Sequence, residues 1–371
     1  MTRRLTRKLA RRLITIAALI LAATSTALLR SGTAAPDMTP IPATDPAVLR
    51  PLTGDRRLVV ILADNAGTET TDLLVPHGIL QRSGAVDVLI VSTEEGAVDL
   101  MPALTIMPDM TVAAFHDIHP EGADAVIVPA FHSRGTEATT DFIRNQAGKG
   151  AMIVSICEGS EPVAQAGLFD GRAATTHWFA QGRMTRRYPG ATWVQNRRYI
   201  VDGPVMSSSG VSASVPATLR FLEILAGDEV ARHTATDLGV GEWSSQHDSS
   251  RFSLDFGTAR LAAGNLLGFW RHEVLVAPVV DGFDGIAFAL QADAWSRTYR
   301  SRLVAGNAAG MATSAEGVAF LTKISPRNDA AIDPLTGGPL AALDASLEAI
   351  SGRYGPRTAD FVAAQLEYHW P

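Results

Sequence analysis

The feature of this chain that most restricts its fold is the alternation of strand patterns with helix patterns that starts at Arg57. Leu58–Ala63 and Val86–Ser92 are largely apolar runs of strand length, and Asp72–Ser83 between them has apolar residues at helical spacing. Strands that are apolar throughout are buried on both faces, as in a parallel sheet that helices cover on both sides. The sequence therefore predicts an α/β fold with a mostly parallel sheet.

The same alternation continues through the first half of the chain. The further strands that we expect are Ala123–Pro129, Ala151–Ile156, Arg172–Thr176 and Arg198–Val201. The further helices that we expect are Thr139–Gln146, Glu161–Leu168 and Val215–Leu225. In an open parallel sheet, ligands bind beyond the carboxyl ends of the strands. Cys157 directly follows one of the predicted strands, so this rule places it at the binding site.

The second half of the chain repeats part of the first. The segments that echo the strand, helix, strand and strand order of residues 58–104 are Val274–Val280, Ala287–Trp295, Ser301–Val304 and Gly317–Leu321. The chain then closes with two helix-like stretches, Pro339–Ile350 and Thr358–Tyr368. We therefore predict a first domain over residues 55–230 and a partial, degenerate α/β repeat over residues 231–371. A chance likeness between two α/β patterns is the alternative.

The first 35 residues have the composition of a targeting segment. Six basic residues precede the uncharged run Leu13–Leu29, and Arg30 and the small-residue stretch Ser31–Ala35 follow it. This order is typical of a secretory signal, and the run also reaches the lower limit of roughly 17 residues for a membrane-spanning helix. We expect a signal peptide or membrane anchor over residues 1–35 and a proline-rich linker over residues 36–54. A buried helix of a cytoplasmic protein is the alternative.

Both interpretations of this segment leave its basic end in the cytoplasm and export the rest of the chain. The expected location is therefore extracytoplasmic, either anchored in the membrane or periplasmic or secreted after cleavage. The membrane is an expected partner through residues 13–29.

Charge and cysteine content exclude several classes of function. The chain has 32 basic and 38 acidic side chains, and residues 1–35 hold seven of the basic ones and no acid, which leaves 25 against 38. An acidic body repels phosphate groups, so we expect no nucleic-acid partner. A single cysteine excludes an intramolecular disulfide and a multi-cysteine metal site. We expect no metal and no other cofactor.

The sequence SICEGS at residues 155–160 is typical of a nucleophile elbow, in which a buried strand turns sharply into a helix. Such a turn strains its central residue and lifts that side chain out of the sheet. The N-terminus of the following helix would favour the thiolate form of Cys157. Gly159 lacks the side chain that would keep strand and helix apart. A lone cysteine buried in the core is the alternative.

Two further residues are candidates for acid–base chemistry. His177 follows the predicted strand Arg172–Thr176, so its imidazole could hold the thiol proton of Cys157 or stabilise the thiolate. Asp72 opens the first helix, where an acid is commonly a helix cap. The functional alternative is a carboxyl group that points toward Cys157 and, when protonated, donates a hydrogen bond to the thiolate or to a substrate.

Four stretches carry a resemblance to a known family, namely LVVILADNAGTETTDLLVPHGIL, DAVIVPA, GAMIVSICEGSEPVAQAGLFDGRAATTHW and YIVDGPVMSSSGVSASVPATLRFLEIL. They resemble successive blocks of the DJ-1/PfpI family, in the class I glutamine amidotransferase-like superfamily, and most closely the sensor domains of AraC-type regulators. The resemblance covers about Arg57–Ala226 and implies a flavodoxin-like sandwich. It also implies that Cys157 is the nucleophile, His177 the nearby imidazole and Asp72 the acid before the first helix.

The sequence departs from the family pattern in three places. The family's Gly-Gly pair after the third strand, whose amides help to form an oxyanion hole, is Ala130-Phe131 here. Glu158 follows the nucleophile where a small residue or Thr is usual, and no helix-turn-helix domain follows the first domain. In the repeat, Ala287 stands where the matching acid would be. The residues that we expect around the oxyanion site and pocket are Glu158, Gly159, Ala130, Phe131, Trp178, Ser209 and Gly210.

The residues and the resemblance together predict a cysteine-dependent hydrolase or lyase that acts on a small carbonyl, amide or nitrile-like substrate. Cys157 would attack, His177 would carry the proton and the amide of Glu158 would help to hold the oxyanion. One alternative is a non-catalytic ligand-binding or redox-sensing domain that signals through an oxidised Cys157. A second alternative, by family analogy, is AraC-like transcriptional regulation. Many family members dimerise, so a homodimer is a candidate state.

Overall fold

The fold was obtained as a computed structural model that describes residues 42–370, apart from residues 53, 254, 324–329 and 337. The predicted signal or anchor therefore lies outside the described residues. Within the described ranges, no helix combines the length and the apolar character needed to cross a bilayer.

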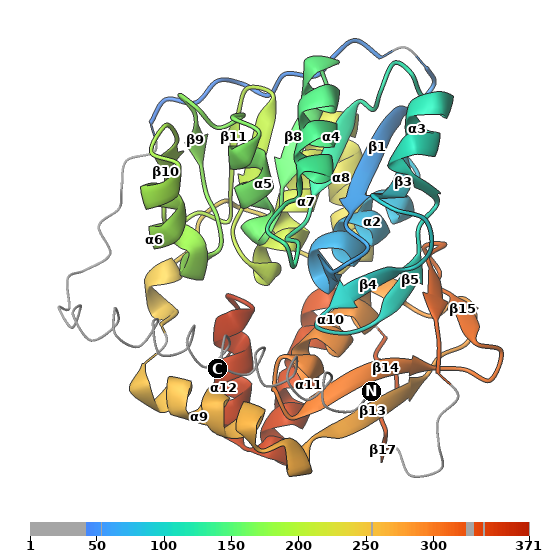
Figure 1. The fold of residues 1–371 in the computed structure, drawn as a ribbon, viewed down its shortest axis with the longest axis vertical. Helices are drawn as coiled ribbons and strands as arrows, with labels where there is room; N and C mark the ends of the chain where they lie inside the picture. The colour runs from blue at the N-terminus through green and yellow to red at the C-terminus, as the bar shows by residue number, and fades with distance from the viewer. Residues whose placement is uncertain (1–41, 53, 254, 324–329, 337, 371) are drawn as a thin grey trace, which may run out of the picture.

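A seven-stranded sheet forms the centre of the first unit, residues 57–226 (Figure 1). Its strands, in spatial order, are β11 (Tyr199–Asp202), β12 (Val205–Ser208), β8 (Met152–Ser155), β7 (Ala125–Val128), β1 (Arg57–Ala63), β3 (Val86–Ser92) and β6 (Met110–Thr111). Neighbouring strands are parallel except for β11, which runs antiparallel to β12. The predicted α/β class with a mostly parallel sheet is confirmed.

Helices pack on both faces of this sheet, as the continuous apolar strands require. The helices on one face are α2 (Thr70–Ser83), α7 (Ser214–Ala226) and α8 (Asp228–Asp237). Those on the other face are α3 (Val112–Ile118), α4 (Glu137–Gly148), α5 (Ser160–Gln165) and α6 (Trp178–Arg187). Alternate residues of β1 contribute to the two separate cores, for example Ile61 to the first and Leu62 to the second. The result is an α/β sandwich of flavodoxin type.

One predicted strand of the first unit is largely absent. Of Arg172–Thr176, only β9 (Ala173–Ala174) is a strand, and it pairs with β10 (Thr192–Trp193) outside the main sheet. Side chains of the main sheet replace the missing strand partner. The Asp202 carboxylate accepts the N–H of Ala173 at 2.8 Å, and the Ser207 hydroxyl accepts the N–H of Thr175 at 2.8 Å.

The C-terminal unit, residues 273–370, contains the predicted order of strand, helix, strand and strand. Its elements are β13 (Glu273–Pro278), α10 (Gly285–Ser296), β14 (Ser301–Gly306), β15 (Met311–Thr313), β16 (Ala319–Leu321), β17 (Ala330–Ala331), α11 (Pro339–Tyr354) and α12 (Pro356–Gln365). β13 and β14 are parallel neighbours in a three-stranded sheet with β17. Between the two units lies α9 (Phe256–Leu267).

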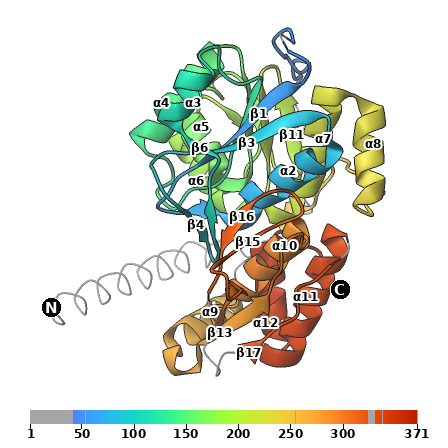
Figure 2. The ribbon, with the colours of Figure 1, turned by 90° about the vertical axis from the view of Figure 1, so that its right-hand side faces the viewer.

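The two units share one sheet and one helix pair, which lie side by side in both views (Figures 1 and 2). The shared sheet has the order β15-β16-β5-β4-β2, in which β4 (Val98–Met101), β5 (Thr105–Met107) and β2 (Thr68–Glu69) come from the first unit. α10 packs directly on α2. The closest approach is at Gly78, where a Cβ atom would collide with the side chain of Ile286. The C-terminal unit is therefore docked on the helix that carries Asp72.

Candidate active site

Cys157 occupies the turn predicted from the SICEGS motif. β8 ends at Ser155, and a single 3-10 turn, η1 (Cys157–Gly159), leads into α5. The backbone of Cys157 has φ +56°, a left-handed conformation that is strained for a residue with a side chain. A Cβ atom at Gly159 would collide with the carbonyl oxygen of Val128, so glycine is needed for the close approach of turn and strand. The predicted nucleophile-elbow geometry is confirmed.

The surroundings of Cys157 raise the pKa of its thiol and so favour the protonated form. Only 8% of the residue is exposed, and burial raises its pKa well above the usual range. Asp72 in its ionised form, Glu158 and Glu69 raise this pKa further by charge repulsion, whereas the charge of Arg297 lowers it. The prediction that the helix N-terminus favours the thiolate is therefore wrong. The first turn is a single 3-10 turn among acidic groups, and their repulsion and the burial outweigh its dipole.

Asp72 is a buried carboxyl group on the same side of the site. It has no exposed surface, and its Oδ2 accepts the N–H of Ala130 at 3.1 Å. Ala130 follows Pro129, which a Cβ atom at Gly159 would also contact, so Asp72 and the elbow flank the same short segment. Among the described residues, Oδ1 of Asp72 has no hydrogen-bond partner. Burial raises the pKa of Asp72 well above its usual value, and the charge of Glu69 adds to the rise.

Asp72 is not the helix cap that the alternative interpretation proposed, because another residue caps α2. The N-cap of α2 is Glu69, whose carboxylate accepts the N–H of Asp72 at 2.6 Å. Asp72 is therefore left as a protonated carboxyl group with one oxygen unused, which can donate a hydrogen bond beside Cys157.

In the segment that replaces the family's Gly-Gly pair, the backbone N–H and carbonyl of Ala130 both form hydrogen bonds. The N–H of Ala130 is bound by Asp72, and its carbonyl accepts the N–H of Glu69 at 2.8 Å. Phe131 forms an isolated β-bridge with Thr68, and its side chain is buried in the second core. In this structure the Ala130 amide therefore points to Asp72, the partner that a bound oxyanion would have to replace.

The side chain of Glu158 forms an ion pair with Arg183 of α6. This pair gives a reason for an acid at the position after the nucleophile, where the family has a small residue. Arg183 also binds Glu161 at 3.0 Å, so it anchors the elbow and α5 to α6.

His177 lies next to the elbow but is bound elsewhere. Its neighbour Thr176 donates a hydrogen bond to the carbonyl oxygen of Cys157 at 3.3 Å. The His177 ring caps α6, with Nδ1 accepting the N–H of Phe179 at 3.3 Å and Nε2 donating to the carbonyl of Gln365 at 3.1 Å. Because both ring nitrogens have backbone partners, the imidazole is not free to take the proton of Cys157 in this arrangement.

The remaining predicted pocket residues lie where the C-terminal unit meets the first unit. Trp178 donates from Nε1 to the carbonyl of Ala364 at 3.0 Å, and the N–H of Gly210 binds the carboxylate of Glu367. Ser209 is buried, and its hydroxyl has no partner among the described residues. Contacts from α12 and the residues after it therefore cover this flank of the site.

Three charged groups near Cys157 were not predicted from the sequence. Arg297 follows α10 and donates to Glu69 at 2.7 Å and to Asp293 at 2.8 Å. Burial raises the pKa of Asp293 to about 8, although the charge of Arg297 opposes the rise. The one sequence signal for this group is the repeat, in which Arg297 has the position that Arg82 has in the first unit.

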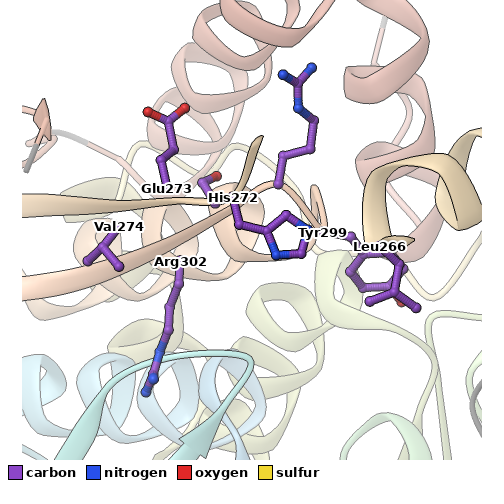
Figure 3. A pocket seen from close by; sticks show the side chains of 8 residues that line it. Leu266, His272, Glu273, Val274, Tyr299 and Arg302 are labelled. Atoms are coloured by element: carbon purple, nitrogen blue, oxygen red, sulfur yellow. The ribbon is translucent and has the colours of Figure 1, made fainter. Parts of the chain in front are cut away.

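Two cavities among the described residues lie away from the predicted site. The one in Figure 3 has a volume of about 270 Å³ and is lined by Leu266, His272, Glu273, Val274, Tyr299, Arg300, Ser301 and Arg302. The His272 ring points toward Tyr299, and Leu266 lies beside that ring. Neither Cys157 nor Asp72 contributes to this pocket. Within the described ranges, no group of three or more His, Cys, Asp or Glu side chains is placed to hold a metal ion.

The fold and the site define an α/β protein with a strained cysteine on a nucleophile elbow and a protonated carboxyl group beside it. The sequence profile of the DJ-1/PfpI family matches residues 56–224, and this chain belongs to that family. The match ends before the C-terminal unit.

Similar proteins have different names and activities. The "Isonitrile hydratase" of Pseudomonas putida is 30% identical over 165 residues, which are 43% of this chain and 69% of that protein. "Protein dj-1beta" of Drosophila melanogaster is 25% identical over 49% of this chain and 96% of its own length. The "HTH-type transcriptional regulator CdhR" of Pseudomonas aeruginosa is 29% identical over 32% of this chain and 35% of its own length.

Solved structures of similar proteins include that of Drosophila melanogaster DJ-1beta. It is 21% identical in sequence, with a TM-score of 0.46, and the likeness covers 50% of this chain and 99% of that one.

Proposed function

We propose that this protein is a cysteine-dependent hydrolase or lyase in which Cys157 adds to a small, uncharged electrophile and Asp72 carries the protons. The observation that carries the proposal is the buried, protonated Asp72, whose Oδ1 is unused and which flanks the same segment as the elbow. The two groups that would meet the substrate, the thiol and the carboxyl group, are both neutral when protonated, which favours an uncharged substrate because a buried unpaired charge is costly.

The first half of the reaction joins the sulfur to the substrate. The Cys157 sulfur forms a bond to the electrophilic carbon, and the π electron pair of that carbon moves to the atom bonded to it. In a carbonyl compound the oxygen takes the carboxylic proton of Asp72, whereas in an isonitrile the attacked carbon itself takes it, because its lone pair remains there, and a thioimidate forms. Asp72 then takes the thiol proton, so it ends the step protonated.

The second half returns the sulfur to its starting state. In an amide, the nitrogen first takes the hydroxyl proton through Asp72 and leaves as the amine, and the carbonyl re-forms as a thioester. Water then attacks the same carbon and its hydroxyl group is added, while the C–S bond breaks. Asp72 gives its proton to the leaving sulfur and takes one from the water. His177, held by Phe179 and Gln365, keeps α6 and α12 in place in this scheme and does not carry the proton.

Isonitriles and small carbonyl compounds are the substrates to test first. A relative 30% identical to this chain is named an isonitrile hydratase, and others, 26–28% identical, are named deglycases. The assay uses the purified full chain with small isonitriles, α-oxoaldehydes and short amides. Cys157→Ser and Asp72→Asn should each abolish turnover of the same substrate. Asp124→Asn is the matched control, since Asp124 is also a buried acid but precedes β7 at the opposite edge of the sheet.

The redox-sensing alternative is an outcome of the same experiment. Peroxide oxidises thiolates, and the raised pKa of Cys157, caused mainly by burial, works against that chemistry. If no substrate is turned over and dilute peroxide converts Cys157 to a sulfenic acid faster than it does in the denatured chain, the protein is a sensor. The match to CdhR covers about a third of that regulator, so we propose no transcriptional role.

We also propose that the exported body lies at the membrane surface. The basic and apolar segment of residues 1–35 supports this location. A patch of exposed side chains on α9 and the turn after it adds support, because Phe256, Phe269 and Trp270 are each at least 70% exposed. Residues 256–272 include two arginines and no acid, which suits an anionic lipid surface.

A further inference from the structure

The first helices of the two units have the same capping pattern. Glu69 caps α2 and accepts the N–H of Asp72, and Asp284 caps α10 and accepts the N–H of Ala287 at 2.9 Å. Asp72 and Ala287 therefore occupy the same position in the two helices. This agrees with the alignment of the predicted repeat.

The helix ends match as well. A left-handed residue stands at the same distance from the helix cap in both units, at Gly84 directly after α2 with φ +61° and at Tyr299 beyond the end of α10 with φ +57°. A tyrosine in that conformation is strained, so its occurrence at the equivalent position of the second unit indicates a shared backbone plan.

The contacts between the two helices are reciprocal. Arg82, near the end of α2, binds the cap of the other helix, Asp284, at 2.7 Å. Arg297, at the end of α10, binds Glu69 at 2.7 Å. Each arginine stands the same number of residues after the cap of its own helix. Contacts in which i meets j and j meets i are the signature of a two-fold interface between identical subunits.

The shared sheet has the same symmetry. β5 and β16 pair antiparallel at its centre, and each is followed outward by its own antiparallel neighbour, β4 or β15. The predicted repeat therefore meets the first unit as a second copy of the chain would, with a helix pair and a strand pair around one axis (Figure 2).

We propose that the C-terminal unit is a built-in partner that occupies the pairing face of the first unit, and that its Arg297 is a positioning residue of the Cys157 site. This inference rests on the proposed role of Cys157 as the reactive centre. It assigns a function to a part of the chain that lies beyond the family match at residues 56–224.

The reciprocal pairs have different neighbours. Arg82 binds Asp284 and Glu316 in a unit where Ala287 replaces the acid, so it serves the interface alone. Arg297 binds Glu69, the residue that holds the first turn of α2 and the N–H of Asp72. The Arg297–Glu69 pair therefore supports the reactive site. The equivalent Arg82–Asp284 pair does not, so a substitution of Arg82 is an internal control for one of Arg297.

Arg297 is one of several charged groups that act on the ionisation of the site. Its charge lowers the pKa of both Cys157 and Asp72, against the larger effect of burial, which raises both. The ionisable groups that act on the thiol come from three segments: Glu69 and Asp72 at the start of α2, Glu158 in the elbow, and Arg297 after α10. Arg183 of α6 pairs with Glu158, and Asp293 of α10 pairs with Arg297.

The C-terminal unit also ties both flanks of the site together. The Gln365 side chain donates to the carbonyl of Arg297 at 3.1 Å, and the Gln365 carbonyl accepts the bond from His177 at 3.1 Å. A continuous series of hydrogen bonds therefore runs from His177 through Gln365 and Arg297 to Glu69.

The test compares Arg297→Ala with Arg82→Ala in the full chain, by the pH dependence of Cys157 alkylation with iodoacetamide under native conditions. Arg297→Ala should move the alkylation midpoint to higher pH, and the rate at a fixed pH below the midpoint should fall about tenfold for each pH unit that the midpoint moves. Arg82→Ala should leave the midpoint unchanged, although it removes the equivalent contact. Arg297→Lys should restore part of the wild-type profile, because it restores the charge.

Equal midpoints for the two alanine variants would overturn the role of Arg297. Alkylation needs no substrate, so this result is separate from a failure of the proposed catalysis. If Arg297→Ala does not fold, Arg297→Met, which keeps the apolar stem, replaces it. Sedimentation of the wild-type chain at micromolar concentration should show a monomer. A stable dimer that forms through α2 would overturn the proposal that the C-terminal unit occupies the pairing face of the first unit.

Discussion

The two units of this molecule share a scaffold and differ in chemistry. Both begin with a strand, a capped helix and a parallel strand, and both retain an arginine that reaches the cap of the other helix. The first unit keeps Asp72 and Cys157, whereas the second has Ala287 and no cysteine. The second unit thus retains the residues that contact the first unit, but it lacks the reactive groups. This difference suggests that the second unit is retained for what it does to the first.

The largest expected effect comes from making the first helix like the second. Asp72→Ala places at the active site the residue found at position 287. Turnover should fall by about 10²–10⁴-fold, because the substrate loses its proton donor. The free energy of unfolding should fall by about 1–3 kcal/mol, because the buried N–H of Ala130 loses its acceptor, although the unpartnered oxygen of Asp72 is removed as well. Steady-state kinetics and chemical denaturation measure the two effects; full activity in this variant would refute the role given to Asp72.

The sequence predicted the elements of both units well, for a physical reason. A strand buried on both faces must be apolar throughout, so Leu58–Ala63 and Val86–Ser92 could be recognised without knowledge of their neighbours. The elbow could be predicted in the same way, because it needs only a strand, a cysteine and a nearby glycine.

Features that depend on long-range contacts could not be predicted. Arg172–Thr176 has strand-like composition, but the side chains of Asp202 and Ser207 take its hydrogen bonds. Arg297 meets Glu69 across 228 positions of the chain. Nothing local distinguishes it from a surface arginine. The raised pKa of Cys157 likewise follows from burial and neighbouring acids that only the folded chain brings together.

The second largest effect is expected from a substitution at Gly78, where the two units approach each other most closely. A Cβ atom there would meet the side chain of Ile286, so Gly78→Ala should destabilise the fold by about 1–3 kcal/mol through overpacking. The variant should also alkylate faster at Cys157, because the C-terminal unit would separate more readily from the site.

Gly148→Ala is the matched control for this prediction, since a Cβ atom at the end of α4 meets nothing within 4 Å. It should be neutral or stabilising by about 0.5–1 kcal/mol. A Gly78→Ala variant as stable as Gly148→Ala would show that the two helices can separate slightly without cost.

A smaller effect is expected from pH. Burial raises the pKa of Asp293 to about 8, from a usual value near 3.8. A group whose pKa is raised in the folded chain stabilises fully below its unfolded pKa and loses that contribution as pH rises to the folded value. The melting temperature of the wild type should therefore fall more between pH 5 and pH 8 than that of Asp293→Asn. Parallel curves would show that Asp293 stays ionised beside Arg297.

The smallest expected effect concerns the exposed side chains of α9 and the turn after it, between the two units. Trp270 is 70% exposed and lies in the acid-free stretch of residues 256–272. If this face rests on anionic lipid, the indole should enter the interfacial layer, where aromatic side chains are favoured. Vesicles that contain brominated lipid should then quench the tryptophan fluorescence of the full chain, and Trp270→Phe should remove part of that quenching. Trp243→Phe, at a half-buried tryptophan, is the control.

Residues 13–29 could hold the chain on vesicles by themselves, so vesicle binding alone does not test the role of Trp270. Equal quenching in the wild type and in Trp270→Phe would show that the second unit serves the first through α10 and α12 alone and does not orient it on a membrane.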